Sequence, residues 1–164
     1  MTNYSVIIRG PAGVGKTTLG KMLAKKIKGY YISVDKILKK HKLDYVQDES
    51  CISEENCLKS NELILLQFSE AIKKNNHLVI EGCFYHKSQL KHLLSKLPNK
   101  SLIFTLKAEL PELIKRDKTR KGIGIESIKA VHKLSSQFDY GIIIDTNNKT
   151  KSQIIKEMGS FLPR

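Results

Sequence analysis

The sequence predicts an α/β domain with a mainly parallel β-sheet. Five short runs are rich in β-branched residues or leucine, and longer segments with helical spacing of apolar residues separate them. Strands that alternate with helices in this way usually lie parallel, and right-handed crossovers place the helices on both faces of the sheet. The length of 164 residues suits one domain, so we expect a single domain over residues 1–164.

The predicted strands are short apolar runs, as the buried strands of parallel sheets are. They cover residues 5–9, 30–34, 77–81, 102–106 and 141–145. A helix is expected at 15–28, between the first two strands, because its apolar residues recur with helical period. After the second strand the pattern is ambiguous over 36–52, apart from a short helix at 36–40.

The later helices begin at residues that favour helix starts. Ser53 can cap a long helix over about 53–75, because Glu54 and Glu55 follow it in the first turn. Pro111 begins another helix at its first position, where a missing N–H costs nothing. The glycines of Gly122-Ile123-Gly124 then interrupt the pattern. Further helices are expected at 87–96, 126–138 and 151–162.

The charge of the chain leaves two interpretations open. Lysine and arginine number 29 against 16 acidic residues, which gives a formal net charge of +13. Such a charge suits a polyanionic partner, such as RNA, DNA or an acidic membrane surface. It equally suits lysines spread over a solvated surface, because the lysines sit in most predicted helices without a long block.

Targeting and redox signals favour the cytoplasm. No apolar run approaches the roughly 18 residues that a membrane span needs, and no basic leader precedes a long apolar stretch at the N-terminus. Cys51, Cys57 and Cys83 form no CxxC pair and suit reduced thiols buried as small hydrophobic side chains. We therefore expect a cytoplasmic protein with no membrane partner.

The first predicted turn carries the strongest motif. Residues 10–17, Gly-Pro-Ala-Gly-Val-Gly-Lys-Thr, match G-x-x-x-x-G-K-[ST], and they follow a predicted strand and open a predicted helix. In that context the backbone N–H groups form a nest for phosphate oxygens. Lys16 would reach the β- and γ-phosphates and Thr17 would ligate Mg²⁺. The predicted nucleotide contacts here are Gly10, Ala12, Gly13, Val14, Gly15, Lys16, Thr17 and Thr18.

Other features narrow the kind of nucleotide protein. Asn148-Lys149-Thr150-Lys151 begins like the base-reading string of GTPases but has lysine in place of its aspartate, and no Asp-x-x-Gly switch motif is present. The chain is also short for a helicase or a transporter ATPase. A small kinase fits its size.

The chain resembles the small P-loop kinases, which include the shikimate, gluconate and adenylylsulfate kinases and the kinases related to chloramphenicol phosphotransferase and the zeta toxins. The resemblance rests on the phosphate-binding motif and on the order of elements along nearly the whole chain. It implies a three-layer P-loop NTPase fold with a five-stranded parallel sheet in the order 2-3-1-4-5. It also implies a lid at about 116–125 and an acceptor-binding region at about 35–60.

The resemblance assigns roles to two carboxylates. Asp35, just after the second strand, would orient the acceptor hydroxyl and accept its proton; it could also cap the helix at 36–40. Glu81, which ends the third strand, resembles the acid that holds Mg²⁺ through water; it could instead pair with a lysine. Phe84, Tyr85 and His86 follow and could line the acceptor pocket, although core packing suits Phe84 equally well.

Two of the four arginines lie in the expected lid. Arg116 and Arg120 are four residues apart, so one helical face presents both. In similar kinases such arginines close over the nucleotide, where one stacks on adenine and the other neutralises the transferring phosphoryl group. A solvated cluster with Asp117 is the alternative. The turn after the fifth strand, with Asn147, would border the adenine.

Together these residues predict an ATP-dependent phosphotransferase acting on a hydroxyl, with Lys16, Asp35, Arg116 and Arg120 as catalytic residues and Mg²⁺ at Thr17 and Glu81. A small metabolite or nucleoside is the favoured acceptor. Two alternatives remain: a 5′-hydroxyl polynucleotide kinase, which the charge suits, and an ATPase switch without an acceptor.

Overall fold

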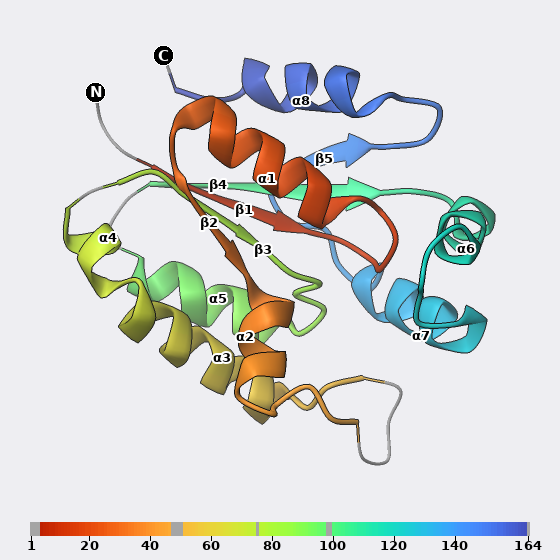
Figure 1. Ribbon diagram of the computed structural model, residues 1–164, viewed down its shortest axis with the longest axis horizontal. Helices are drawn as coiled ribbons and strands as arrows, with labels where there is room; N and C mark the ends of the chain where they lie inside the picture. The colour runs from red at the N-terminus through yellow and green to blue at the C-terminus, as the bar shows by residue number, and fades with distance from the viewer. Residues whose placement is uncertain (1–3, 47–50, 75, 98–99, 164) are drawn as a thin grey trace.

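The fold is a parallel sheet of five strands between two layers of helices. In this computed structural model, residues 4–46, 51–74, 76–97 and 100–163 are described. The strands are β1 Ser5–Arg9, β2 Tyr30–Ser33, β3 Leu78–Glu81, β4 Ser101–Lys107 and β5 Ile142–Asp145. Their order across the sheet is β2-β3-β1-β4-β5, and every neighbouring pair is parallel (Figure 1). The predicted fold class and strand order are confirmed.

The central strand β1 is buried along its whole length. Ile7 pairs with Ile80 of β3 on one side and with Ile103 of β4 on the other. Side chains of a strand alternate between the two faces of the sheet. Accordingly, Val6 and Ile8 belong to one apolar core and Ile7 to the other.

The helices cover both faces of the sheet and also its carboxyl edge. They are α1 Lys16–Ile27, α2 Val34–Lys40, α3 Glu54–Gln67, α4 Ser69–Lys73, α5 Lys87–Lys96, α6 Leu110–Lys118, α7 Ile125–Ser135 and α8 Lys151–Ser160. Figure 1 shows α1 and α8 on one face and α3, α4 and α5 on the other. Helices α6 and α7 lie beyond the carboxyl ends of the central strands, and the segment between them contains most of the residues expected as a lid, at about 116–125.

The element bounds differ from the prediction in two places. The helix expected at 53–75 is broken at Phe68, which ends α3 and starts α4; its backbone, with φ of −104° and ψ of 16°, is not helical. The break lets Phe68 pack against the core below the sheet. Val34, expected in the second strand, is the first residue of α2. The predicted cap is confirmed, because the Ser53 Oγ accepts a hydrogen bond from the Asn56 N–H at 3.3 Å.

Across the described part of the chain, no helix combines the length and the apolar character that crossing a membrane requires.

Candidate nucleotide and acceptor site

The phosphate-binding motif forms a loop between β1 and α1. Gly10, Gly13 and Gly15 have φ values of 148°, 83° and 103°, a region that side chains with a Cβ rarely adopt. At Gly10 the space is also closed, since a Cβ would lie 2.6 Å from the backbone oxygen of Leu106. The glycines therefore permit a tight loop whose backbone leads directly into the N-terminus of α1, where anions bind well.

Lys16, the first residue of α1, holds its ammonium inside this loop. Its side chain is buried, and its Nζ donates a hydrogen bond to the backbone oxygen of Pro11 at 2.8 Å. Val14 anchors the loop in the apolar core. Thr17 and Thr18 are exposed at the start of the helix. The cation and the helix N-terminus thus face the same small space, which suits a phosphate chain.

Glu81 lies at the carboxyl end of β3 and is fully buried. Its Oε1 accepts hydrogen bonds from the Tyr31 hydroxyl at 2.8 Å and from the Thr17 Oγ1 at 3.3 Å. Its Oε2 has no partner in the described structure, although it is buried. Burial and the neighbouring Glu81 carboxylate both raise the pKa of Tyr31, so this phenol stays a hydrogen-bond donor.

The oxygen atoms of Thr17 and Glu81 fit a magnesium ion. Mg²⁺ prefers hard oxygen ligands and is usually held by one or two carboxylates, waters and substrate phosphates. An unpartnered buried carboxylate oxygen is costly, and a cation or its bound water would satisfy it. No group of three or more His, Cys, Asp and Glu side chains suited to a metal occurs among the described residues. A magnesium ion here would therefore depend on the nucleotide for further ligands.

Asp35 lies in the first turn of α2, two residues after the N-cap residue Ser33. The alternative prediction that Asp35 caps this helix is therefore wrong. Its side chain is exposed, but neighbouring protein atoms displace part of its hydration water, and this desolvation raises the pKa of the carboxyl. The nearby Lys16 ammonium lowers the same pKa, and the Glu81 carboxylate raises it.

A cavity of about 380 Å³ opens beside Asp35, which is within the size range of small-molecule sites. Ala12 of the phosphate loop lines one end, and Val131 of α7 lines the lid side. Cys51, Cys57 and Cys83 all line it as well. Burial raises the pKa of the Cys83 thiol to about 11, while the Lys16 ammonium lowers it. The inner end of the cavity therefore meets the phosphate loop.

The three residues after Glu81 and Gly82 shape this cavity. Phe84 is both buried in the core and part of the lining, so its two predicted roles coincide. Tyr85 lines the cavity too, and its hydroxyl accepts a hydrogen bond from the Ile52 N–H at 2.9 Å. The His86 Nε2 lies 2.8 Å from the Ile52 backbone oxygen. His86 thus holds the wall of the cavity and is not itself among the lining residues.

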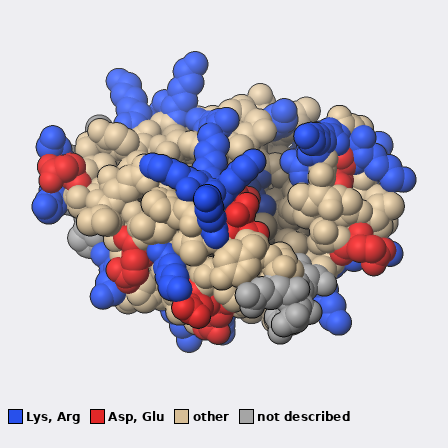
Figure 2. Space-filling model, turned by 60° about the horizontal axis from the view of Figure 1, so that its bottom comes forward, with Lys and Arg blue, Asp and Glu red and all other residues tan. Residues whose placement is uncertain are grey.

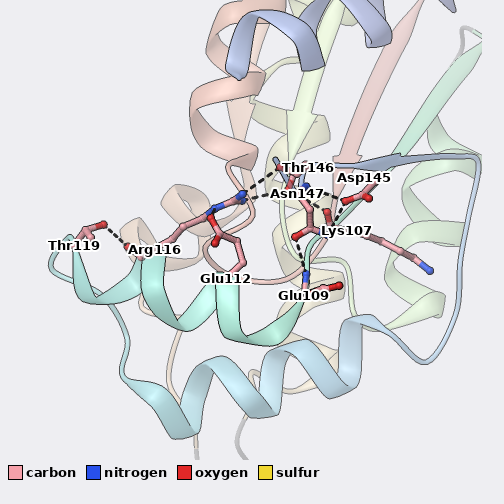
Figure 3. A network of polar contacts seen from close by, with 8 residues as sticks. All are labelled: Lys107, Glu109, Glu112, Arg116, Thr119, Asp145, Thr146 and Asn147. Atoms are coloured by element: carbon pink, nitrogen blue, oxygen red, sulfur yellow. Dashed lines mark hydrogen bonds and ion pairs between the residues drawn. The ribbon is translucent and has the colours of Figure 1, made fainter. Parts of the chain in front are cut away.

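Arg116 reaches from α6 to the turn after β5 (Figure 3). Its Nη1 donates to the Thr146 Oγ1 and its Nη2 to the Thr146 backbone oxygen, each at 3.2 Å. Its Nε pairs with Glu112 at 2.9 Å. The Asn147 Oδ1 accepts a hydrogen bond from the Glu109 N–H at 3.1 Å. The structure therefore places Arg116 and Asn147 at the same turn, because Arg116 binds Thr146, the residue before Asn147.

Arg120 lies beyond the end of α6 and forms a 3.6 Å ion pair with Asp117. The buried Asp117 carboxylate also accepts hydrogen bonds from the Ile123 and Gly124 N–H groups, at 3.1 and 3.0 Å. A Cβ at Gly122 would overlap this carboxylate. A Cβ on Gly13 of the phosphate loop would lie 3.8 Å from the Arg120 Nη2, which places the guanidinium above that loop.

Three residues of this arrangement were not predicted from the sequence to belong to the site. Tyr31 holds Glu81, Cys83 lies beside Lys16, and Asp117 closes the lid loop. Asp117 entered the sequence reasoning only as a member of a solvated charge cluster with Arg116 and Arg120, whereas its carboxylate is buried. The partners of Tyr31 and Cys83 depend on distant strands, and no local pattern could identify them.

Fold and loop together define a P-loop nucleotide-binding protein of the small-kinase architecture. A family model for the AAA domain matches residues 6–150, and the chain belongs to that family. The resemblance to small P-loop kinases is confirmed at the level of the fold.

Several solved structures share this fold at low sequence identity. A sugar kinase from Janibacter sp. superposes with a TM-score of 0.75 at 15% identity, covering 98% of this chain and 94% of that one. A gluconokinase from Sinorhizobium meliloti superposes with a TM-score of 0.70 at 15% identity, covering 95% of this chain and 89% of that one. A shikimate kinase from Acinetobacter baumannii superposes with a TM-score of 0.64 at 16% identity, covering 98% of this chain and 92% of that one. The search of curated proteins found no match. None of these comparisons supports a nucleic-acid partner.

Proposed function

We propose that this protein is an ATP-dependent phosphotransferase that moves the γ-phosphoryl group to the hydroxyl of a small molecule. The observation that carries the proposal is the meeting of Lys16, Asp35 and Cys83 where the phosphate loop opens into the 380 Å³ cavity. A nucleotide on one side and an alcohol on the other would meet at this point. The kinase neighbours of the fold support the same reaction class.

The chemistry assigns one task to each side chain. Asp35 accepts the proton of the acceptor hydroxyl. The hydroxyl oxygen bonds to the γ-phosphorus, the bond from this phosphorus to the bridging oxygen of the β-phosphate breaks, and ADP leaves. Lys16 neutralises the β- and γ-phosphate oxygens. Thr17 and Glu81 would hold a magnesium ion, which would supply positive charge against the phosphate chain.

Arg116 and Arg120 complete the proposal from the lid. Arg120, whose guanidinium lies above the phosphate loop, would turn from Asp117 toward the transferring group. Arg116 and Asn147 would border the adenine, because Asn147 lies in the turn after β5 and Arg116 binds the same turn at Thr146. Closing the lid excludes water and so limits ATP hydrolysis.

The test is transfer of label from γ-labelled ATP with Mg²⁺ to a pool of small metabolites. Lys16→Ala is expected to abolish transfer, because the cation at the β- and γ-phosphates is lost, while the fold is retained. The matched control is Lys25→Ala, an exposed lysine of the same helix, which should transfer at the wild-type rate. Wild-type turnover in Lys16→Ala would overturn the assignment.

Two other outcomes would select the alternatives. Label on 5′-hydroxyl oligonucleotides and on no small molecule would indicate a polynucleotide kinase. Fast release of free phosphate without any labelled acceptor would indicate an ATPase switch.

A further inference from the structure

The lining of the cavity beside Asp35 is mainly apolar. Its side chains include Val34, Leu38, Ile52, Phe84, Tyr85 and Ile123, in addition to the three cysteines. Burial raises the pKa of the Cys57 thiol to about 12, with further contributions from Cys51 and Cys83, so this thiol stays neutral. Burial likewise raises the pKa of the Tyr85 phenol. These groups offer contact surface to a ligand and no charge.

The charged groups of the cavity are mainly acidic. Asp35 and Asp44 line it, and Lys39 is the one cationic residue among the described lining residues. Lys39 and Asp44 are both exposed at the surface. The Lys16 ammonium lies close to Asp35 but is held in the phosphate loop by the Pro11 backbone oxygen, so it is committed to the nucleotide side of the site.

None of the arginines whose structure is described lines this cavity. Arg9 is fully buried and donates to Thr105, Ser135 and Phe138. Arg116 is bound to Glu112 and Thr146 on the other side of the lid. Arg120 pairs with Asp117. A carboxylate or phosphate enclosed by protein needs an arginine or lysine partner, because an unpaired buried charge is costly.

We infer that the phosphoryl acceptor is an uncharged or cationic alcohol with an apolar, ring-sized body, and not a sugar acid, another carboxylate or a nucleic-acid end. This inference rests on the proposed function for the reaction and on the cavity lining for the choice of acceptor. The apolar body packs against Phe84, Leu38 and Ile123, and its hydroxyl points to Asp35. An anionic acceptor would meet the Asp35 carboxylate and none of the described arginines among the lining residues.

Equilibrium binding of two matched probes tests the acceptor class without requiring turnover. The probes are 2-naphthylmethanol and 2-naphthoate, which share one ring system and differ in charge, titrated by calorimetry into the protein with ADP and Mg²⁺. We expect the alcohol to bind at least about tenfold more tightly, since burying the unpaired carboxylate costs over ~1.4 kcal/mol. Equal or tighter binding of naphthoate overturns the inference, and so does binding of neither probe.

Two lid isoleucines provide a matched pair of variants. Ile123 and Ile125 are both about half exposed, but only Ile123 lines the cavity. Ile123→Arg supplies the missing cation and should reduce the preference for the alcohol about threefold to fivefold, the range of an exposed ion pair. Ile125→Arg should leave the preference unchanged. An equal effect of both variants would assign the preference to general charge and overturn the inference.

Label transfer separates failure of this inference from failure of the proposed function. A metabolite pool is divided by anion exchange into a neutral and cationic fraction and an anionic fraction, and each is offered with γ-labelled ATP. Label confined to the anionic fraction overturns the acceptor class but supports the kinase. If label enters neither fraction although the alcohol probe binds preferentially, the acceptor class stands and the proposed reaction fails.

Discussion

At the scale of single residues, the candidate site is a set of charges held close together in incomplete hydration. Partial desolvation raises the pKa of Asp35, the Lys16 ammonium lowers it, and the Glu81 carboxylate raises it further. A general base benefits from such a shift, since its pKa then lies nearer to neutral pH. The same shift makes the charged carboxylate costly to the folded state.

Asp35→Asn is expected to lower kcat by about 10²–10⁴-fold with little change in KM for ATP, because the variant loses a base and keeps the phosphate loop. Steady-state kinetics measure both constants. In the wild type, kcat/KM should fall on the acid side through an apparent pKa above the ordinary aspartate value, since Asp35 must be deprotonated to accept the proton. A large rise in KM for ATP with normal kcat would instead move Asp35 into the nucleotide site.

The stability of the same variant supplies the control. A carboxyl whose pKa is raised by folding favours the folded state below its unfolded pKa, and that contribution is lost as the pH rises through the folded pKa. The free energy of unfolding of Asp35→Asn near pH 7 should therefore equal or exceed that of the wild type. Reduced stability of Asp35→Asn at neutral pH would show that the carboxylate supports the fold.

At the scale of elements, one buried cation joins the central strand to the end of α7. Arg9 ends β1, immediately before the phosphate loop, and its guanidinium donates to the backbone oxygens of Ser135 and Phe138, each at 3.0 Å. It also lies over the Phe138 ring, 4.2 Å from the centroid. These contacts hold the end of α7 against the lower face of the sheet. The position of α7 relative to the phosphate loop therefore depends on Arg9.

Arg9→Lys is expected to lower the free energy of unfolding by about 2–4 kcal/mol, because one ammonium cannot reproduce the fork of donors and leaves a buried carbonyl unpaired. Urea denaturation measures the change. Lys107→Met is the matched control, since Lys107 also binds the segment after α7, through an exposed ion pair with Asp139. This variant should lower the free energy of unfolding by less than about 1 kcal/mol. Equal costs for the two variants would contradict the role given to Arg9.

At the scale of the whole molecule, the net charge of +13 does not form one continuous surface. Figure 2 shows lysine and arginine side chains in separate groups, with acidic and uncharged areas between them on that face. The ion pairs described are mostly on the surface, such as Lys59–Glu55 at 2.6 Å, and contribute little to stability. A general positive field still attracts a polyanionic nucleotide from solution.

Ionic strength should therefore act differently on the two substrates. Raising potassium chloride from 50 to 500 mM is expected to increase KM for ATP about threefold to tenfold, because salt screens the positive field. The affinity of 2-naphthylmethanol should change by less than about twofold, since it carries no charge. A steep loss of acceptor affinity with salt would point to a polynucleotide, which releases counterions on binding.

The fold class and the phosphate loop could be predicted from the amino-acid sequence alone. Both depend on local patterns: short apolar runs predict buried strands, and the spacing of Gly10, Gly13, Gly15 and Lys16 encodes a loop of positive φ followed by a helix. The strand order was predicted from the resemblance to small kinases, because no local sequence pattern indicates which strands pair with each other. The break at Phe68 was not visible either, since helical periodicity continues through it.

Which side chains surround each charge depends on the tertiary structure. The three cysteines and Phe84 are ordinary apolar residues in the sequence, yet all four line the cavity beside Asp35, where α2 packs against α3. Tyr31 reaches Glu81 because β2 and β3 are neighbours in register. Burial and the charged neighbours of a group depend on which residues lie close together in space. A pattern along the sequence therefore predicts the reactive groups, but it does not predict the surrounding residues that select the substrate.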